Sequence, residues 1–256
     1  MALTVEEASE TYISEMRNVP PPGTGICATC KTFVDGEHYS TCLACSRQPS
    51  LLDAVVPITY SAHLGQIHTA LRTYKEPGSA DVKRFASIRL TAILWRFLAA
   101  HEACIAAAAG IERFSMVTTV PSSSKERDER GSLRQIVEWC APIEQRFQRV
   151  IAPTDEVGPG RGYDERRYAA TAALDGKSVL LVDDTWTGGG HAQSAAYTLR
   201  EAGAVKVGFV AIGRHVRPDW QVSGASCEQL LAALPNRFRW DTCAAHVQEQ
   251  SSGVLR

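Results

Sequence analysis

The 256-residue sequence has almost no surplus of charge of either sign. Lysine and arginine together number 27, and aspartate and glutamate number 28, which gives a formal net charge of -1. A protein that coats DNA or RNA usually carries a basic surplus, so this balance argues against that class. An apolar fraction of 45% and a charged fraction of 21% are ordinary for a soluble globular protein.

The sequence also lacks a segment that predicts membrane insertion or secretion. Its most apolar stretch, residues 90–111, is interrupted by Arg96, His101 and Glu102, so we expect no membrane span. The acidic, amphipathic start MALTVEEASETYISEM has neither the basic n-region nor the apolar core of a signal peptide. We therefore expect a cytoplasmic protein, in which thiols stay reduced. Its eight cysteines then indicate metal binding or packing, not disulfides.

No internal repeat or low-complexity tract is visible, and the apolar pattern predicts strands that alternate with helices. We expect helices over 4–17, 65–74, 81–109 and 132–146, and strands over 54–61, 115–121 and 148–153, with Pro57 at a sheet edge or a bulge. Residues 177–183, 191–203 and 204–213 read as a strand, a helix and a strand, which is a parallel βαβ unit. Because these strands are continuously apolar, both faces of the sheet should be covered.

The stretch VLLVDDTWTGGGH, residues 179–191, predicts a ligand site at the end of the first of these strands. Ligands of open parallel sheets bind at the carboxyl ends of the strands, where Asp183 and Asp184 are expected. The glycines that follow let backbone N–H groups converge at a helix N-terminus, which suits a phosphate.

Two carboxylates that faced a phosphate would repel it, so we expect them to face a pair of hydroxyl groups, with Mg²⁺ nearby. One phosphate and two hydroxyls, one sugar apart, describe a ribose 5-phosphate. The alternative is a solvated Asp-Asp turn before a glycine-rich helix start. Either feature alone would support that alternative, but the whole string in this order is more specific.

Four cysteines near the N-terminus have the spacing C-x2-C-x11-C-x2-C. Two such pairs can complete a tetrahedral zinc site with no open position, which is structural and not catalytic. The predicted ligands are Cys27, Cys30, Cys42 and Cys45. Four unligated thiols in a loop are less compatible with two such pairs at short range, and a redox C-x2-C pair would need a thioredoxin-like βαβ surrounding that is absent here.

The other four cysteines give weaker signals. Cys104 and Cys140 fall in apolar helical patterns and are predicted to be core residues. Cys227 and Cys243, with His215 and His246, could form part of a second metal site, although their spacing matches no compact ligand pattern.

VLLVDDTWTGGGH resembles the phosphoribosyl diphosphate (PRPP) motif of type I phosphoribosyltransferases. The resemblance implies that Asp183 and Asp184 are the catalytic carboxylates that hold the ribose hydroxyls. It implies that the substrate is bound by Thr185, Thr187, Gly188, Gly189, Gly190 and His191. Two residues depart from the motif, because Gly188 and His191 stand where threonine or serine is usual. Thr187 replaces an aspartate base of the purine-salvage members and cannot act as a base near neutral pH, which argues against purine salvage.

An N-terminal Cys₄ ribbon followed by such a domain is similar to the ComF-like family, named for a competence protein. The likeness covers residues 26–213 and includes the looser matches ALRTYKEPG, VPSSSKERDERG and RGYDERRYAA. It implies that Ser122, Ser123 and Lys125 contact pyrophosphate, with Arg127 and Arg130 as candidate helpers. A solvated surface loop is the alternative for these charges. Lys75 could reach the same pyrophosphate or be a solvated lysine at a helix end.

The predicted fold class is α/β, a type I phosphoribosyltransferase-like parallel sheet flanked by helices with a small zinc ribbon. We expect an N-terminal helix and linker over 1–25, the ribbon over 26–50, the main domain over 51–220 and an extension over 221–256. The predicted function is Mg²⁺-dependent transfer of a phosphoribosyl group from PRPP to a small nitrogen acceptor, with release of pyrophosphate. Positioning and electrostatics suffice for such a step.

Two alternatives remain, and a homodimer is a further option. One is a PRPP or nucleotide sensor without turnover, and the other is an accessory factor in DNA uptake or processing. For nucleic-acid contact the ribbon offers Lys31 and Arg47 as cations and Phe33 and Tyr39 for stacking, which is a thin case.

Overall fold

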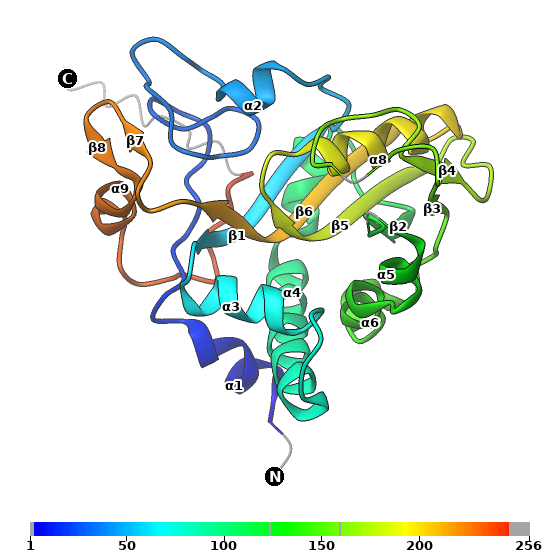
Figure 1. Cartoon of the computed structure of the whole chain (residues 1–256), viewed down its shortest axis with the longest axis horizontal. Coiled ribbons are helices and arrows are strands. Elements are labelled where there is room, and N and C mark those ends of the chain that lie inside the picture. Colours follow the sequence, from blue (N-terminus) through cyan, green and yellow to red (C-terminus); the bar gives the residue numbers. More distant parts are fainter. Residues whose placement is uncertain (1–2, 123, 159, 246–256) are drawn as a thin grey trace, which may run out of the picture.

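A central sheet of parallel strands organises the computed structural model, which describes residues 3–122, 124–158 and 160–245 (Figure 1). The strand order is β1-β6-β5-β2, and all three pairings are parallel. The strands are β1 (Ala54–Ala62), β2 (Met116–Thr119), β5 (Ser178–Trp186) and β6 (Lys206–Val216). Pro57 lies in the edge strand β1, where its missing N–H group costs no ladder hydrogen bond. The predicted α/β class is confirmed.

Helices of different lengths and two small antiparallel sheets surround this core. The helices are α1 (Val5–Ser9), η1 (Glu10–Tyr12), α2 (Leu43–Ser46), α3 (Gln66–Thr73), α4 (Ala80–Ala108), α5 (Lys125–Glu129), α6 (Ser132–Glu138), α7 (Ala141–Glu144), α8 (Gly190–Glu201) and α9 (Cys227–Ala233). The small antiparallel pairs are β3 (Ile151–Pro153) with β4 (Tyr168–Ala170), and β7 (Gln221–Val222) with β8 (Ala225–Ser226). The predicted strand over 148–153 therefore exists, but it lies outside the central sheet.

Both faces of the central sheet are covered, as the continuous apolar strands predict. In Figure 1, α3 and α4 lie on one side of the sheet and α8 lies on the other. Val182 of β5 belongs to the buried cluster on the α4 side, and the neighbouring Leu181 belongs to the cluster on the α8 side. The second cluster includes Cys27 and Cys30, so the cysteine-rich segment packs on the α8 face.

Helix α4 is the core helix of the first face. By length and composition it could cross a membrane, but 56% of its most apolar window is buried inside the molecule. Leu90, Ile93 and Leu94 have no exposed surface. A buried core helix of a globular domain can be as long and as apolar as a membrane span, so packing explains the apolar character of α4.

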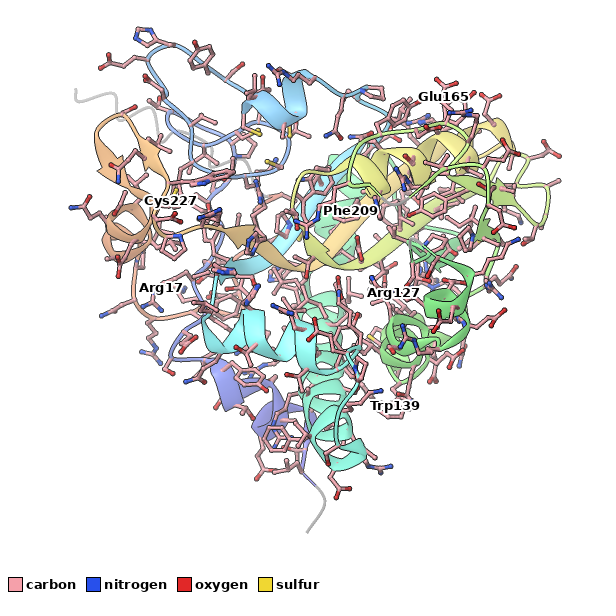
Figure 2. All side chains as sticks on the ribbon, in the orientation of Figure 1. Arg17, Arg127, Trp139, Glu165, Phe209 and Cys227 are labelled. Carbon is pink, nitrogen blue, oxygen red and sulfur yellow. The ribbon has the colours of Figure 1, made fainter. Side chains whose placement is uncertain are left out.

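The helix predicted over 132–146 is wrong as a single element, because α6 ends at Glu138 and α7 begins at Ala141. Pro142 is the reason, since its ring would clash with the preceding turn of a continuous helix. Trp139, at the break, is 37% exposed (Figure 2). The proline was visible in the sequence and is a sufficient signal for a helix end.

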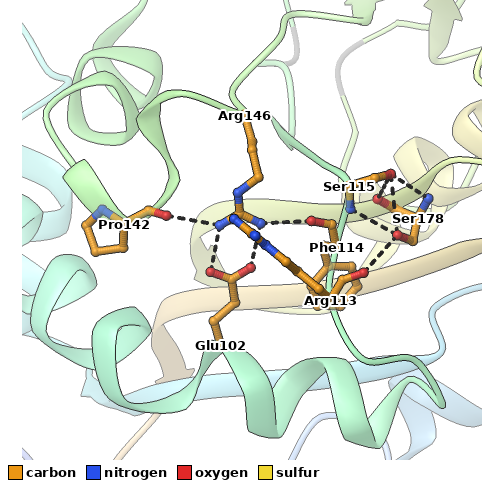
Figure 3. Close-up of polar contacts among 7 residues, drawn as sticks. All are labelled: Glu102, Arg113, Phe114, Ser115, Pro142, Arg146 and Ser178. Carbon is orange, nitrogen blue, oxygen red and sulfur yellow. Dashed lines mark hydrogen bonds and ion pairs between the residues drawn. The ribbon is translucent and has the colours of Figure 1, made fainter.

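A half-buried ion pair fastens α4 to the beginning of β2, at the end of the sheet opposite the carboxyl ends of the strands (Figure 3). Arg146 donates to both carboxylate oxygens of Glu102, at 2.6 and 2.7 Å, and its remaining bonds go to the carbonyl oxygens of Phe114 and Pro142. These two-pronged contacts are the strong form of a charge-assisted hydrogen bond. The ion pair thus fixes the amino end of the sheet, and the functional site lies at the carboxyl ends of the strands.

Candidate functional site

The paired aspartates lie inside β5, close to its carboxyl end. The predicted strand end at Asp183 is wrong, because β5 continues to Trp186 and pairs Thr185 with Gly213 of β6. Successive strand residues point to opposite faces, so the ladder gives the two carboxylates different surroundings. Asp184 is 5% exposed, whereas Asp183 is half-buried.

A cleft of about 910 Å³ opens beside the carboxyl end of β5. It brings together most of the predicted site residues, which are Lys75, Ser122, Asp183, Asp184, Thr185, Thr187, Gly188, Gly189, Gly190 and His191. Lys125 is not in its lining, and Ser123 lies outside the described residues. Segments that are far apart in the sequence thus converge on one cavity.

Asp184 is already engaged by two neighbouring residues of the α3 end. Its Oδ2 accepts a hydrogen bond from Tyr74 Oη at 2.5 Å and an ion-paired hydrogen bond from Lys75 Nζ. Burial, and then the charge of Asp184, raise the pKa of Tyr74 well above its usual range, so its hydroxyl remains a donor. Lys75 is therefore an ion-paired residue of the cleft lining, and its contact with pyrophosphate stays a prediction. Tyr74 was missed because it fits the apolar face of α3.

Asp183 is the carboxylate that is open to the cleft. Its Oδ1 accepts a hydrogen bond from the backbone N–H of Asp184 at 2.8 Å. Burial raises the pKa of Asp183 well above its usual range, and the neighbouring charge of Asp184 adds to the shift, while Lys75 opposes it. A ligand that donates hydroxyl groups, or a cation, would favour the ionised form of Asp183.

Two of the three successive glycines are required by the packing of the loop. A Cβ on Gly189 would lie 2.3 Å from the Trp186 ring, and the φ of Gly189 is +88°. A Cβ on Gly190 would lie 2.3 Å from the carbonyl oxygen of Arg161. A Cβ on Gly188 would meet no atom within 4 Å, so only this glycine could carry a side chain without a clash.

The glycine loop opens into the N-terminus of α8, which faces the cleft. Gly189 is the N-cap, and no side chain caps the helix there. The first N–H groups of a helix have no intrahelical partner, and the helix dipole adds partial positive charge. The loop is therefore suited to hold an anionic group such as a phosphate.

His191 supports the rim of this loop. Its Nε2 forms a hydrogen bond with the carbonyl oxygen of Gly160 at 2.8 Å, which requires the proton on Nε2. Burial lowers the pKa of His191, so the ring is neutral near pH 7. In the structure His191 donates to the backbone of the 160–162 segment, and that donor is not directed at a phosphate.

The loop after β2 supplies the opposite wall of the cleft. The backbone N–H of Ser122 donates to Oδ1 of the buried Asp128, which also binds Arg134 and Arg149. Lys125 pairs with Asp155 outside the cleft, and its contact with pyrophosphate stays a prediction.

Three arginines of the cleft lining carry the positive charge that remains. They are Arg127, Arg130 and Arg161. Among the residues that the structure describes, no acidic side chain forms an ion pair with any of them. Arg127 belongs to α5 (Figure 2).

The four N-terminal cysteines form a cluster that could hold zinc. Their sulfur atoms lie within 4.8 Å of one another, and Cys30 Sγ and Cys42 Sγ are 3.6 Å apart. Tetrahedral zinc with Zn–S bonds of about 2.3 Å separates two sulfur ligands by about 3.8 Å. The backbone N–H of Cys42 and the guanidinium of Arg214 donate to Cys27 Sγ and Cys30 Sγ, which would stabilise thiolates.

The cysteine-rich segment buries two of the four residues that were offered for nucleic-acid contact. Lys31 is 6% exposed, and its Nζ donates to the carbonyl oxygens of Ala28 and Thr29. Phe33 is 8% exposed and stacks on Tyr60 with ring centroids 5.2 Å apart. Two of the four residues offered for nucleic-acid contact are therefore structural.

Three histidines line the cleft, of which the sequence analysis named only His215, and that as a candidate metal ligand. The ring centroids of His63, His68 and His215 lie 4.8 to 5.8 Å apart. Burial, and then the nearby imidazoles, lower the pKa of His215 to about 4. Burial also lowers the pKa of His68. The imidazoles of His68 and His215 are therefore neutral near pH 7, and no local sequence pattern brings residues 63, 68 and 215 together.

Comparisons with known proteins add little to this picture. No family model matches the chain, and no curated protein is similar to it. One similar solved structure is phosphoribosylpyrophosphate synthetase from Mycobacterium smegmatis, at 20% identity and a TM-score of 0.31 over 54% of this chain. The chain spans only 38% of that synthetase.

Another similar structure is purine phosphoribosyltransferase from Pyrococcus horikoshii Ot3. It has 16% identity and a TM-score of 0.31 over 50% of this chain and 91% of its own. Overlaps this small do not assign a function to the chain.

Proposed function

We propose that the cleft binds PRPP and that the protein transfers its phosphoribosyl group to a small nitrogen acceptor. The observation that carries this proposal is the meeting of three features in one cavity. An aspartate pair, a glycine loop at a helix N-terminus and three arginines with no ion pair among the described residues match the hydroxyls, the phosphate and the pyrophosphate of one ligand. The ComF-like assignment rests on motif order alone and remains a proposal as well.

Each part of PRPP has a candidate partner. The 5-phosphate would take the N–H groups of the loop from Thr187 to His191. The ribose hydroxyls would donate to Asp183, and to Asp184 once Lys75 has moved aside. The pyrophosphate would lie against the Ser122 loop with Arg127 and Arg130.

The chain contributes positioning and charge to the transfer itself. The bond between the anomeric carbon and pyrophosphate breaks with its electron pair on pyrophosphate, and a nitrogen lone pair forms the new bond. Arg127 and Arg130 are placed to stabilise the leaving charge. The proton lost by the acceptor nitrogen passes to solvent, since the low pKa of His215 makes this imidazole a weak base near neutral pH.

The donor set also fits a magnesium ion that arrives with the substrate. Mg²⁺ prefers oxygen ligands, and it is usually held by one or two carboxylates together with substrate phosphates. Asp183 and Asp184 are the carboxylates that would hold it. When bound, the ion would neutralise part of the diphosphate charge.

The Lys75–Asp184 ion pair favours a second candidate, a PRPP or nucleotide sensor without turnover. The pair occupies the carboxylate that a ribose hydroxyl would need, and it neutralises one of the two negative charges. A site that binds its ligand without completing this rearrangement would not accelerate transfer.

Calorimetric titration of the full chain with PRPP, with and without Mg²⁺, tests the proposal. Ribose 5-phosphate and AMP serve as comparison ligands. Mg²⁺-dependent binding that weakens at least about tenfold in Asp183→Asn is expected, since a charge-assisted hydrogen bond is worth about 1.5–3 kcal/mol. Asp155→Asn, outside the cleft, is the matched control and should bind normally.

A pyrophosphate-release assay with ammonia and simple amines then separates the two candidates. Release with any acceptor supports transfer, and tight binding without release supports a sensor. If wild-type protein binds none of the three ligands, both candidates are wrong.

A further inference from the structure

A second cluster of metal-ligating side chains lies far from the cleft, between α4 and the segment that follows α9. His101 and Cys104 are one helical turn apart on α4, and Cys243 approaches them from residues 238–245. Their candidate ligand atoms all lie within 4.8 Å of one another. His101 is 3% exposed and Cys243 is 2% exposed, so the cluster is buried.

The distances in this cluster match those of a tetrahedral zinc site. Cys104 Sγ lies 3.6 Å from His101 Nδ1. With Zn–S bonds of about 2.3 Å and Zn–N bonds of about 2.0–2.1 Å, a tetrahedral ion separates a sulfur ligand and a nitrogen ligand by about 3.6 Å. A shared ion accounts for this spacing directly.

The orientation of His101 is also that of a metal ligand. Its Nε2 lies 2.7 Å from the carbonyl oxygen of Trp240, so Nε2 carries the proton and donates it to that oxygen. The lone pair is then on Nδ1, which faces Cys104. Zinc-bound histidines commonly donate their other ring N–H to a backbone carbonyl, which fixes the tautomer and orients the ring.

We propose that His101, Cys104 and Cys243 supply three ligands to a second zinc ion, with water or a further ligand in the fourth position, and that this ion fastens residues 238–245 to α4. Two thiolates and an imidazole bind zinc in preference to magnesium or calcium, which take oxygen ligands. In the sequence His246 follows Cys243 by three residues, but it lies outside the described residues. The three described ligands carry the proposal.

The neighbouring contacts show why a bridge at this position would matter. Arg96 of α4 lies over the Trp240 ring at 4.4 Å, and Arg239 exchanges two backbone hydrogen bonds with the side chain of Asn18. These contacts align the segment on α4, and a metal would lock it there. Metal binding energy of this kind appears as folding energy.

This grouping replaces the second metal site considered from the sequence. Among the described residues, Cys243 clusters with His101 and Cys104 and not with Cys227 or His215. Cys227 lies on the α9 side of the molecule (Figure 2). A histidine and a cysteine three residues apart on one helix share a face, which was the signal available in the sequence.

Metal analysis of the full chain, purified under a phosphine reductant in zinc-containing buffer and then desalted, tests the proposal. Wild-type protein should carry about two zinc ions per chain, one for each site. The double variant Cys104→Ser/Cys243→Ser should carry about one, and so should Cys42→Ser/Cys45→Ser, which removes the N-terminal site instead. Cys227→Ser is the matched control for a buried cysteine outside both clusters and should keep about two.

Substitutions of His101 distinguish a ligand from a packing residue. His101→Cys retains a ligand atom and should keep the second zinc, whereas His101→Phe fills the space and should lose it. Wild-type protein with one zinc or fewer per chain would overturn the proposal even if no variant folds. A double variant Cys104→Ser/Cys243→Ser that folds and still holds about two would also overturn it.

Discussion

Arg214 donates a hydrogen bond from Nη2 to Cys30 Sγ at 3.3 Å and, from Nη1, another to the carbonyl oxygen of Thr187 at 3.2 Å. The same buried guanidinium also donates to the carbonyl oxygens of Cys30 and Trp186. One cation therefore joins the N-terminal cysteine cluster to the loop that we expect to hold a phosphate. The cluster and the cleft are parts of one supporting structure.

Replacing Arg214 by lysine should lower the free energy of unfolding by about 2–3 kcal/mol. Lysine cannot reproduce the planar set of donors, and it would leave buried acceptors without partners. Urea denaturation measures the change. Arg217→Lys is the control, because Arg217 forms an exposed pair with Asp219, and it should change stability by less than about 1 kcal/mol.

If zinc occupies the N-terminal cysteine cluster, its removal should weaken PRPP binding, although none of the described residues that line the cleft is a cysteine. Cys45→Ser would remove one ligand of the cluster that contains Cys30, to which Arg214 donates. A displaced Arg214 would no longer hold the carbonyl oxygen of Thr187, and the loop would loosen. We expect affinity to fall about tenfold, since a loosened loop would lose roughly one hydrogen bond's worth of binding energy. Unchanged affinity in a folded, zinc-depleted variant would mean that the two parts are independent.

Alanine substitutions at two adjacent glycines should have opposite outcomes. Gly189→Ala places a methyl group against the Trp186 ring at a positive φ, so it should distort the loop and abolish measurable PRPP binding. Gly188→Ala meets no atom within 4 Å and should retain binding. Calorimetry reports both, and near-UV circular dichroism of the tryptophan signal checks whether the loop has moved.

Lys75→Met should weaken PRPP binding about tenfold, because the lysine offsets the negative charge of the aspartate pair beside an anionic ligand. Its loss should also raise the pKa of Asp183 further, since Lys75 opposes the upward shift. Lys177→Met, an exposed lysine in the turn before β5, is the matched control. Tighter binding in Lys75→Met would show instead that the ion pair blocks the site.

The stability of the protein should fall as pH drops from about 6.5 to about 4, and His215 should contribute to that loss. Its folded-state pKa of about 4 is below the usual value of 6.5. In this window the unfolded chain binds a proton that the folded chain does not, so acid favours unfolding. His215→Gln should flatten the slope of stability against pH, and an NMR titration in which His215 has a pKa near 6.5 would contradict the assignment.

The sequence predicted the sheet well because its signal is local. Two continuous apolar runs and the 13-residue helical stretch between them, which ends at Gly203, were enough to place β5, α8 and β6. The end of β5 was misplaced because Asp183 and Asp184 look like turn residues. Their strand conformation comes from pairing with β6, which no local pattern reveals.

The candidate site was predicted only where its residues share one short stretch. Tyr74 and Lys75 lie more than a hundred positions from Asp184, and their contact depends on how α3 packs beside β5. Cys104 was assigned to the core because its helical pattern is apolar. Its partner Cys243 comes from a segment with no recognisable pattern of its own.

The two hydrogen bonds between the Asn18 side chain and the backbone of Arg239, here called the clasp, have a mechanical consequence. Residues near both ends of the described chain meet on α4, where Arg96 pairs with Glu10 and also lies over Trp240. A pulling force applied through these two ends would load the clasp first and would reach the β5–β6 ladder only after the clasp had opened. The molecule would yield in two steps, and a metal bridge at Cys243 would set the force of the first.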